Sequence, residues 1–517
     1  MRQLAKPSAT QLTGFSGKLR TWQLTAGAAA FGLVIAAGAV AAAGPWDSSG
    51  QRTAERDRAA SQEAWGGADH AGRGPEGAPE SAPSAPTVLA GLGAPAGAAP
   101  APTGSAMADV LDPLLKDPAL GPERSAVVLD VASGKRVYGK GAGDGLTPAS
   151  TVKIATAVAA LSAAGPDHRI MTKTLLEPAS GDSSGDSSGH SSGDSSGDSS
   201  DARGVVLVGG GDPTLTARKD GRYTDTAASL RTLAKDTART LKTRDIDEVK
   251  LSYDTSLYSG PGQHPIGPNE NITPVSALMA DEGRLDDSSS GPAPRAEDPA
   301  GGAAKKFAGF LKDEGIKTKS DPGPAKAGDG AEALAKVESP PLSALVERML
   351  THSDNDIAEA LARQAAVAAK EPASFEGAGR VVRAQLEKLD LPLSGTMFAD
   401  GSGLDRADRI SAELLAALLN RAADPARPEL RSVVTGLPVA GFTGTLVDRY
   451  PKDSPGTGVV RAKTGTLTGV NSLAGTVVDA DGRLLVFAFM TTGTTDPTGA
   501  QAALDHMAST VANCGCR

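Results

Sequence analysis

The sequence predicts an α+β fold in which one antiparallel sheet is assembled from the two ends of the folded region. Residues 123–141 alternate apolar and polar side chains on both sides of Ala132-Ser133-Gly134, a pattern typical of a β-hairpin. Strand patterns at residues 458–467, 471–480 and 484–493 follow near the other end, and a helical pattern covers about residues 497–512. Because helical patterns lie between the two groups of strands, we expect the helices to flank the sheet.

The segments between these ends also carry periodic patterns. Residues 146–165 are typical of an apolar helix, with Pro148 near its start and Gly165-Pro166 at its end. Residues 204–212 and 246–254 resemble strands, and residues 227–243 form an amphipathic helical pattern between them. A pair of helices around a polar hinge is predicted for residues 339–369.

The N-terminal 106 residues are predicted to direct export of the chain and to tether its folded part. Residues 1–46 combine four basic side chains with an uncharged run at 21–45, which is long enough to span a membrane and indicates export. Ala39-Val40-Ala41 is a suitable cleavage site, so a signal peptide and an uncleaved membrane anchor are both open. Residues 47–106 are rich in Ala, Pro and Gly, and we expect a disordered tether.

Composition argues against several classes of function. The net charge of -9 and the aromatic content of 3% disfavour nucleic acid as a partner. The six His are scattered and form no metal-binding pattern, so no metal and no cofactor are expected. Cys514 and Cys516, near the C-terminus, are interpreted as part of a frayed tail.

The first pattern that could carry chemistry is Ser150-Thr151-Val152-Lys153. On a helix, residues three positions apart share a face, so the Lys153 amine can reach the Ser150 hydroxyl. A serine becomes a good nucleophile when a neighbouring base removes its proton, and an amine can do so when burial lowers its pKa. The pattern alone is weak evidence, but no other lysine in the chain has a serine three positions before it.

Two further patterns follow in suitable contexts. Ser353-Asp354-Asn355 lies at the hinge between the two predicted helices, where ordinary helix capping is the competing interpretation. Lys463-Thr464-Gly465-Thr466 lies within a strand pattern, where its glycine indicates close approach of a ligand to the backbone. An ordinary edge strand protected by a lysine would explain this second pattern equally well on its own.

Together, the three patterns resemble the signature set of penicillin-binding proteins and serine β-lactamases. Each occurs once, in the order Ser-x-x-Lys, Ser-x-Asn, Lys-Thr-Gly. The resemblance implies a penicillin-binding/β-lactamase-like transpeptidase domain, an antiparallel sheet with flanking helices. It also implies an extracytoplasmic enzyme, either membrane-anchored through its N-terminal segment or secreted to the cell wall.

The spacing of the patterns selects a branch of this group. The 200 residues from Lys153 to Ser353 are far more than a compact β-lactamase has there. The chain therefore resembles the D-alanyl-D-alanine carboxypeptidase/endopeptidases, the penicillin-binding-protein-4-like class C low-molecular-mass group, which carry a large insertion at this point. Similar stretches are GGGDPTL, NITPVSALM, DGSGL and GFTGTL at residues 209–215, 271–279, 400–404 and 441–446.

This resemblance implies a domain division. The catalytic domain would comprise residues 107–165 and 340–517, and the inserted region residues 166–339. Within the insert, residues 181–200 repeat Gly-(Asp/His)-Ser-Ser and are expected to form a disordered loop. Residues 189–193 match G-x-S-x-G, but the flanking repeat lacks the strand and helix that a nucleophile elbow needs.

The resemblance also implies roles for the site residues. Ser150 would attack the bond between two D-alanines of a peptidoglycan stem peptide, with Lys153 as general base, and Ser353 would protonate the leaving amine. The remaining residues would bind substrate: Asn355, Lys463, Thr464, Gly465 and Thr466. β-Lactam antibiotics would act as covalent inhibitors by acylating Ser150. Asp400, Ser402 and Gly403 are interpreted as cleft-lining residues or as a tight turn.

Two alternatives remain at this point. A class A β-lactamase would carry Glu and Asn four residues apart some 35 residues after Ser-x-Asn, and no such pair is present around residues 385–395. A non-catalytic penicillin-binding sensor or wall-binding module would not need the complete set of Ser150, Lys153, Ser353 and Lys463. The sequence therefore favours a D-Ala-D-Ala carboxypeptidase.

Overall fold

The computed structural model describes residues 100–178, 202–219 and 227–516. The expected signal peptide or anchor, nearly all of the tether and the repeat at residues 181–200 lie outside these described residues. Among the helices in the described ranges, none is both long and apolar enough to cross a membrane.

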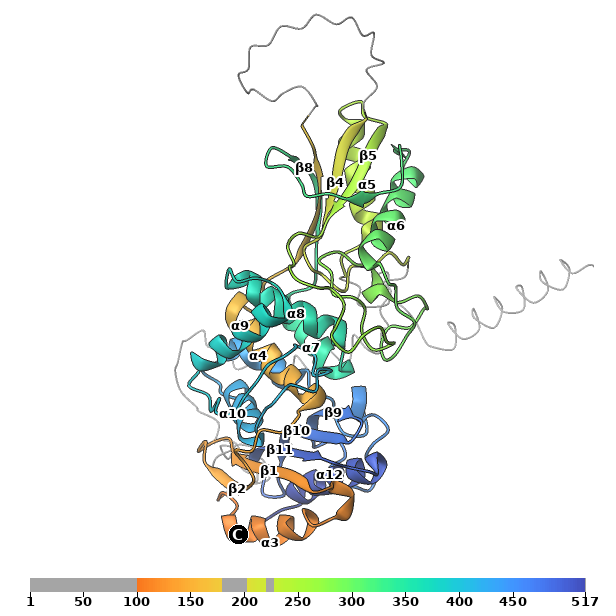
Figure 1. The fold of residues 1–517 in the computed structure, drawn as a ribbon. Helices are drawn as coiled ribbons and strands as arrows, with labels where there is room; N and C mark the ends of the chain where they lie inside the picture. The colour runs from red at the N-terminus through yellow and green to blue at the C-terminus, as the bar shows by residue number, and fades with distance from the viewer. Residues whose placement is uncertain (1–99, 179–201, 220–226, 517) are drawn as a thin grey trace, which may run out of the picture. The chain divides into compact units, whose positions relative to one another are not determined.

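The first sheet is antiparallel and has the strand order β2-β1-β11-β10-β9. It joins the N-terminal hairpin to the three C-terminal strands, which confirms the predicted architecture (Figure 1). Its strands are β1 (Glu123–Asp130), β2 (Arg136–Lys140), β9 (Arg461–Leu467), β10 (Val470–Val478) and β11 (Leu484–Thr492). Strand β9 lies at the edge, so one side of its backbone is not paired with another strand of this sheet.

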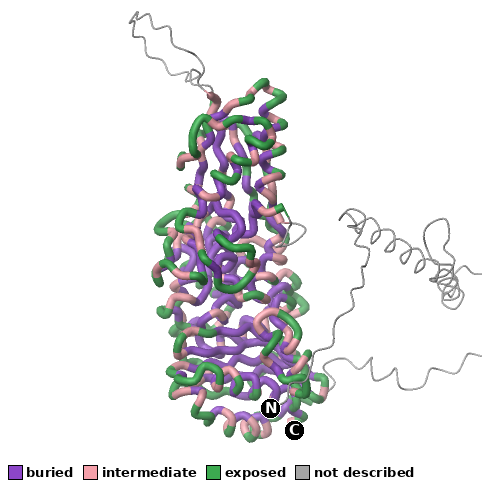
Figure 2. The backbone as a smooth tube through the Cα atoms, turned by 90° about the vertical axis from the view of Figure 1, so that its right-hand side faces the viewer, coloured by how far each residue is buried: buried purple, intermediate pink, exposed green. Residues whose placement is uncertain are grey.

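Helices cover both faces of this sheet. One face packs against a helical layer made of α4 (Lys153–Ala164), α7 (Leu342–His352), α8 (Asn355–Ala368), α9 (Phe375–Glu387), α10 (Ala412–Ala422) and α11 (Arg431–Thr435). The other face packs against α3 (Gly104–Leu114) and α12 (Pro497–Ala512). Helix α4 is buried from Lys153 to Leu161. Figure 2 shows that buried segments fill the middle of the described chain, with exposed segments at its surface.

The two ends of the described chain meet beside α12. Helix α3 begins at Gly104 rather than at Met107, because the Thr103 side chain caps it by accepting a hydrogen bond from the Ala106 N–H. The expectation of a frayed C-terminal tail is wrong. Cys514 is buried in the core between α12 and the sheet, Cys514 and Cys516 form a disulfide, and the Cys516 carbonyl accepts a hydrogen bond from the Thr103 N–H.

A second sheet occupies the chain between α4 and α7. Its strand order is β6-β5-β4-β3-β8, and the short strand β7 (Gly323–Pro324) also pairs with β5. The strands are β3 (Met171–Leu176), β4 (Arg203–Val208), β5 (Glu248–Asp254), β6 (Lys317–Thr318) and β8 (Glu332–Glu338). Helices α5 (Leu230–Lys242) and α6 (Pro299–Asp313) share a separate hydrophobic core with this sheet. Strands β3 and β8 pair across more than 150 residues of sequence, and neither was predicted.

Candidate active site

Ser150 lies in a short 3-10 helix, Ala149–Val152, that leads directly into α4. The residue before it, Ala149, has a φ of 49°, a left-handed conformation that a residue with a side chain adopts only under constraint. Gly403 supplies part of this constraint, because a Cβ at Gly403 would lie 2.0 Å from the Ala149 carbonyl oxygen. The serine is therefore presented on a tightly held turn at the start of a buried helix.

Lys153 is the first residue of α4, and its side chain is fully buried. Its Nζ atom lies 3.0 Å from Ser150 Oγ, 2.7 Å from Asn355 Oδ1 and 2.6 Å from the Ser402 carbonyl oxygen. Burial lowers the pKa of Lys153 to about 8, although nearby carboxylates, Asp400 first among them, act in the opposite direction. A free amine is thus accessible near neutral pH, in contact with the hydroxyl that it would have to deprotonate.

The Ser402 carbonyl belongs to a tight turn built around Asp400. The Asp400 carboxylate accepts hydrogen bonds from the N–H groups of Ser402 and Gly403, and from the Ser402 hydroxyl. The structure therefore agrees with the tight-turn interpretation. Asp400, Ser402 and Gly403 are not among the residues that line the cavity beside Ser150, although the Ser402 carbonyl contacts Lys153.

Ser353-Asp354-Asn355 connects α7 to α8. Ser353 ends α7 in a left-handed conformation with a φ of 57°. Asp354 caps α8 by accepting a hydrogen bond from the Ile357 N–H at 3.0 Å, so the capping interpretation holds for this residue. Asn355 has two contacts: its Oδ1 accepts from Lys153, and its Nδ2 donates to the Asn271 carbonyl at 3.0 Å. One amide thus links the lysine to the inserted region.

Gly465 allows β9 to lie directly against the segment that carries Ser150. A Cβ at this position would lie 2.1 Å from Ser472 Oγ and 2.6 Å from the Pro148 carbonyl oxygen. The Ser472 hydroxyl also donates to that carbonyl at 2.7 Å, which holds the serine segment to the sheet. The glycine predicted to mark close approach is in contact with the protein's own backbone.

The side chains around Gly465 have different surroundings. Lys463 is fully buried, and its Nζ donates to the Thr464 carbonyl at 2.8 Å. Burial, together with the charges of Lys153 and Arg449, holds the pKa of Lys463 well below its usual range. The Thr464 hydroxyl lies 2.8 Å from the Thr445 hydroxyl.

The backbone of Thr466 faces the free edge of the sheet. Residues on an antiparallel strand alternate between hydrogen-bonded and non-hydrogen-bonded pairs. Gly469 binds Gly493 on the β11 side, so alternate residues of β10 face β11, and Asn471 is among them. Asn471 is the partner of Thr466, which therefore directs its N–H and C=O away from β10.

A cavity of about 220 Å³ lies between these segments. Ser150, Ser353, Asn355 and Thr466 line it, which brings parts of all three sequence patterns to one pocket. The lining does not include Lys153, Lys463, Thr464 or Gly465. The inserted region supplies Asn271, Arg284, Gly291 and Pro292 to the lining, and the other lining residues are His352, Asp354 and Leu404.

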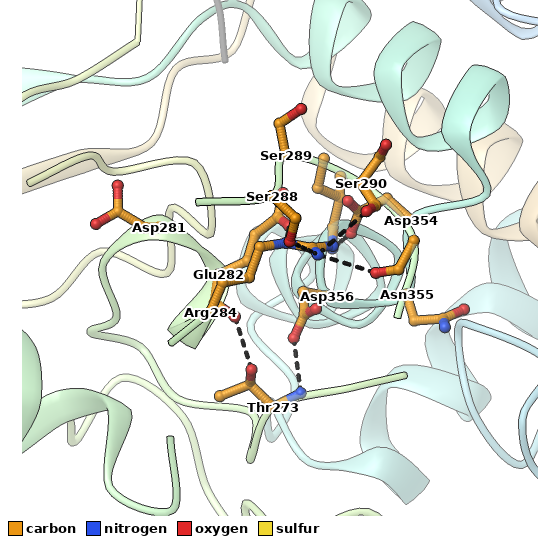
Figure 3. A network of polar contacts seen from close by, with 12 residues as sticks. Thr273, Asp281, Glu282, Arg284, Ser288, Ser289, Ser290, Asp354, Asn355 and Asp356 are labelled. Atoms are coloured by element: carbon orange, nitrogen blue, oxygen red, sulfur yellow. Dashed lines mark hydrogen bonds and ion pairs between the residues drawn. The ribbon is translucent and has the colours of Figure 1, made fainter. Parts of the chain in front are cut away.

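A buried network of charges joins the inserted region to the Ser353–Asn355 segment (Figure 3). Asp356 accepts a hydrogen bond from the Thr273 N–H at 2.9 Å and pairs with Arg295 at 2.9 Å. Arg284 pairs with Glu282 at 2.8 Å and also donates to the Gly291 carbonyl at 2.9 Å. Because Arg284 and Gly291 line the cavity, this network fixes the wall that faces Ser150.

Sequence reasoning missed part of this wall. Asn271 and Leu404 lie in stretches that resemble the family, so a signal for them was present. Arg284, Gly291 and Pro292 lie in or beside a polar, Gly/Pro-rich segment, and no local pattern indicates their position.

The antiparallel sheet, the helices on both faces and the serine–lysine pair at a helix start define a serine peptidase of the penicillin-binding class. The chain belongs to the D-Ala-D-Ala carboxypeptidase 3 (S13) family, whose model matches residues 107–294 and 286–514. It is accordingly a serine-type D-Ala-D-Ala carboxypeptidase, a hydrolase.

Individual relatives are similar over most of their length. Carboxypeptidase DacB of Mycolicibacterium smegmatis is 35% identical over 426 residues, covering 81% of this chain and 86% of the relative. The D-alanyl-D-alanine carboxypeptidase of Actinomadura is 28% identical over 75% of this chain and 81% of its own. The crystal structure of penicillin binding protein 4 from Haemophilus influenzae has the same fold, with a TM-score of 0.59 and 22% identity, covering 77% of this chain and 98% of that chain.

Proposed function

We propose that Ser150 is the nucleophile and Lys153 the general base of a carboxypeptidase that removes the terminal D-alanine from peptidoglycan stem peptides. The observation that carries this proposal is the 3.0 Å contact between Lys153 Nζ and Ser150 Oγ, with the lysine buried and its pKa lowered to about 8. A general base works best when its pKa lies near the working pH, and this lysine meets that condition.

In the first step, Lys153 takes the hydroxyl proton while Ser150 Oγ attacks the carbonyl carbon between the two D-alanines. The backbone N–H groups of Ser150 and Thr466 form the oxyanion hole in this proposal. Two observations support these donors. The Ser150 N–H lies at the start of a helix, where such groups have no intrahelical partner, and the Thr466 N–H faces the free strand edge.

Collapse of the tetrahedral intermediate breaks the C–N bond. The Ser353 hydroxyl gives its proton to the leaving amine and is reprotonated by the Lys153 ammonium, which returns Lys153 to its neutral form. Asn355 holds the substrate amide, a role supported by its position on the cavity wall. D-Alanine leaves, and the remaining peptide is joined to Ser150 by an ester. Water then attacks this ester while Lys153 accepts its proton. The bond from the carbonyl carbon to Ser150 Oγ breaks, Lys153 returns the proton to Oγ, and the shortened peptide is released.

The residues of β9 bind the terminal carboxylate of the substrate. Thr464 and Thr466 supply hydroxyl groups, for which Thr464 must exchange its present partner, Thr445, for the carboxylate. Lys463 supplies positive potential from behind the strand. The arrival of a carboxylate raises the pKa of a buried lysine, so substrate itself favours the charged form of Lys463.

The same acyl-enzyme chemistry extends to two other ligands. A cross-link between two stem peptides presents a comparable amide bond, so endopeptidase activity is part of the proposal. β-Lactams acylate Ser150 and leave slowly, since no Glu–Asn pair of the class A type is present in the sequence. Peptidoglycan lies outside the cytoplasmic membrane, so the enzyme acts there, either anchored by residues 1–46 or secreted to the wall.

The experiment is a comparison of D-alanine release from a D-Ala-D-Ala peptide by the wild type and three variants. Ser150→Ala and Lys153→Ala should abolish release, whereas Ser105→Ala, at an exposed position of α3, should retain it. Circular dichroism should show the same fold in all four proteins. Release of D-alanine at the wild-type rate by either active-site variant would overturn the assignment.

A further inference from the structure

His264 is a buried histidine of the inserted region that the proposed mechanism does not use. Its side chain is fully buried, and its Nε2 lies 2.9 Å from Asp400 Oδ2. Its Nδ1 accepts a hydrogen bond from the Ile266 N–H at 3.3 Å, so the proton of a neutral ring lies on Nε2 and points at Asp400. The Phe375 ring packs against the imidazole at right angles, which fixes its plane.

Asp400 in turn controls the position of the Ser402 carbonyl. Its two oxygens accept hydrogen bonds from the Ser402 N–H and the Ser402 hydroxyl, each at 3.0 Å. The Ser402 carbonyl accepts from Lys153 Nζ at 2.6 Å, which is the shortest of the three contacts that the lysine makes. An unbroken chain of hydrogen bonds therefore runs from His264 through Asp400 and Ser402 to Lys153.

We propose that His264 is a positioning residue for Lys153: its Nε2–H orients the Asp400 carboxylate and partly compensates its negative charge, which keeps the Ser402 carbonyl on the lysine amine and preserves the amine as a base. This inference rests on the proposed role of Lys153. The inserted region would then do more than line the pocket, because one of its side chains would adjust the proton affinity of the catalytic base.

The charges around Asp400 determine whether loss of the His264 donor raises or lowers the pKa of Lys153. Burial alone would raise the pKa of Asp400, but the hydrogen bond from His264 and those from the turn lower it to about 2. Burial and the charge of Asp400 raise the pKa of Asp408 to about 10, so Asp408 stays protonated. Burial and the same charge raise the pKa of Glu359 to about 7. Asp400 is thus the carboxylate that stays charged throughout the working range.

Two further carboxylates act on these groups. Burial acts to lower the pKa of His264, but the hydrogen bond and charge of Asp400, followed by the charges of Glu359 and Asp405, raise it. For Lys153, the charges of Asp400 and Asp354 oppose the larger lowering of its pKa by burial. Without the Nε2–H donor, Asp400 remains ionised, because its pKa lies far below the working range. Its negative charge is then compensated by one hydrogen bond fewer. Its charge then acts more strongly on Lys153 and raises the pKa of the amine.

A metal ion is a poor alternative explanation for this cluster. His264, Glu359 and Asp400 bring three ligand atoms within 4.8 Å of one another. However, backbone N–H groups already occupy the carboxylates: Glu359 accepts from Gly401 and Ser402, and Asp400 accepts from Gly403 and Asp405. The His264 Nε2–H also points at the Asp400 carboxylate, so this nitrogen has no lone pair available for a metal ion.

The test is a matched pair of variants, His264→Gln and His264→Asn. Glutamine can place an N–H donor where Nε2 lies, whereas the shorter asparagine side chain cannot reach Asp400. The measurement is the rate of acylation by a fluorescent penicillin as a function of pH. His264→Asn should move the midpoint of the acidic limb upward by roughly half a unit to one unit, a threefold to tenfold lower rate below the midpoint. For His264→Gln, the midpoint should lie close to the wild-type value, because the donor to Asp400 is retained.

The controls separate this inference from the proposed function. Lys153→Ala tests the base itself, and if that variant is acylated normally, the proposed function fails. If Lys153→Ala is inactive but His264→Asn has the wild-type midpoint or a lower one, only the inference about His264 is overturned. If His264 had a purely structural role, His264→Asn would lower the unfolding temperature and the fraction of active enzyme without moving the midpoint of the acidic limb. His506→Asn, on the exposed side of α12, should leave both the midpoint and the rate unchanged.

Discussion

Substitution of Gly465 by alanine tests whether close contact between β9 and the serine segment is required for catalysis. The new Cβ would lie 2.1 Å from Ser472 Oγ and 2.6 Å from the Pro148 carbonyl oxygen, whereas ordinary contact begins at 3.4 Å. The Ser472 hydroxyl can rotate away from the new Cβ, but the Pro148 carbonyl belongs to the backbone and can move only with its segment. The strand and the segment leading to Ser150 must therefore separate by roughly 1 Å, an overpacking strain that costs about 1–3 kcal/mol.

A displacement of this size acts on the reacting atoms directly. It would separate the Thr466 N–H from the Ser150 N–H, the two proposed donors to the oxyanion. A misplacement of about 1 Å reduces a rate by about 10²-fold, so we expect kcat/KM for a D-Ala-D-Ala peptide to fall by about that factor. The loss should appear mainly in kcat, because the donors act on the transition state.

The control for this substitution is Gly302→Ala. Gly302 lies in α6, where an added Cβ would meet nothing within 4 Å, and alanine favours a helix over glycine by about 1 kcal/mol. This variant should keep full activity and be slightly more stable. If Gly465→Ala keeps kcat/KM within about threefold of the wild type while remaining folded, the close contact has no role in catalysis.

Two other predictions concern pH and the charge network. The acylation rate should rise about tenfold per pH unit up to about pH 8 and then level off, because Lys153 must lose its proton; a rate that is constant from about pH 6 to 9 would contradict this. The same lowered pKa means that the native state binds fewer protons than the unfolded chain between about pH 8 and 10.5, so the contribution of Lys153 to stability rises with pH across that window. At about pH 8, above the pKa of about 7 to which burial raises Asp356, Asp356→Asn should lower the free energy of unfolding by about 3 kcal/mol, because it leaves the buried Arg295 side chain without its ion-pair partner. It should also raise KM more than it lowers kcat, and unchanged denaturation curves and KM would refute the role assigned to this network.

The sequence predicts the first sheet because the N-terminal hairpin carries a local alternating pattern and the three C-terminal strands are short runs separated by turn residues. The contact between Lys153 and Ser150 is equally local, since the two residues are three positions apart in the sequence. The contact between Lys153 and Asn355 spans 202 residues, and only the family resemblance places these side chains together. Strands β3 and β8 were not predicted, because their stability comes from pairing with segments distant in sequence. Strand β3 pairs with both β4 and β8.

The detailed surroundings of the site could not be predicted for the same reason. The Ser402 carbonyl acts on Lys153 through its backbone, and a residue type gives no information about where a carbonyl points. Arg284 lines the cavity because Glu282 and the Gly291 carbonyl hold it there, which depends on the packing of the inserted region. The partners of Lys463 and Thr464 likewise follow from the tertiary structure around β9.

The most direct test of the central claim is the identification of the residue that forms the acyl-enzyme. The wild-type protein would be incubated with a penicillin, digested with a protease and analysed by mass spectrometry. The penicilloyl group should be found on the peptide that contains Ser150, and fragmentation should place it on that side chain. A stable adduct on any other residue, Ser353 included, would contradict the account.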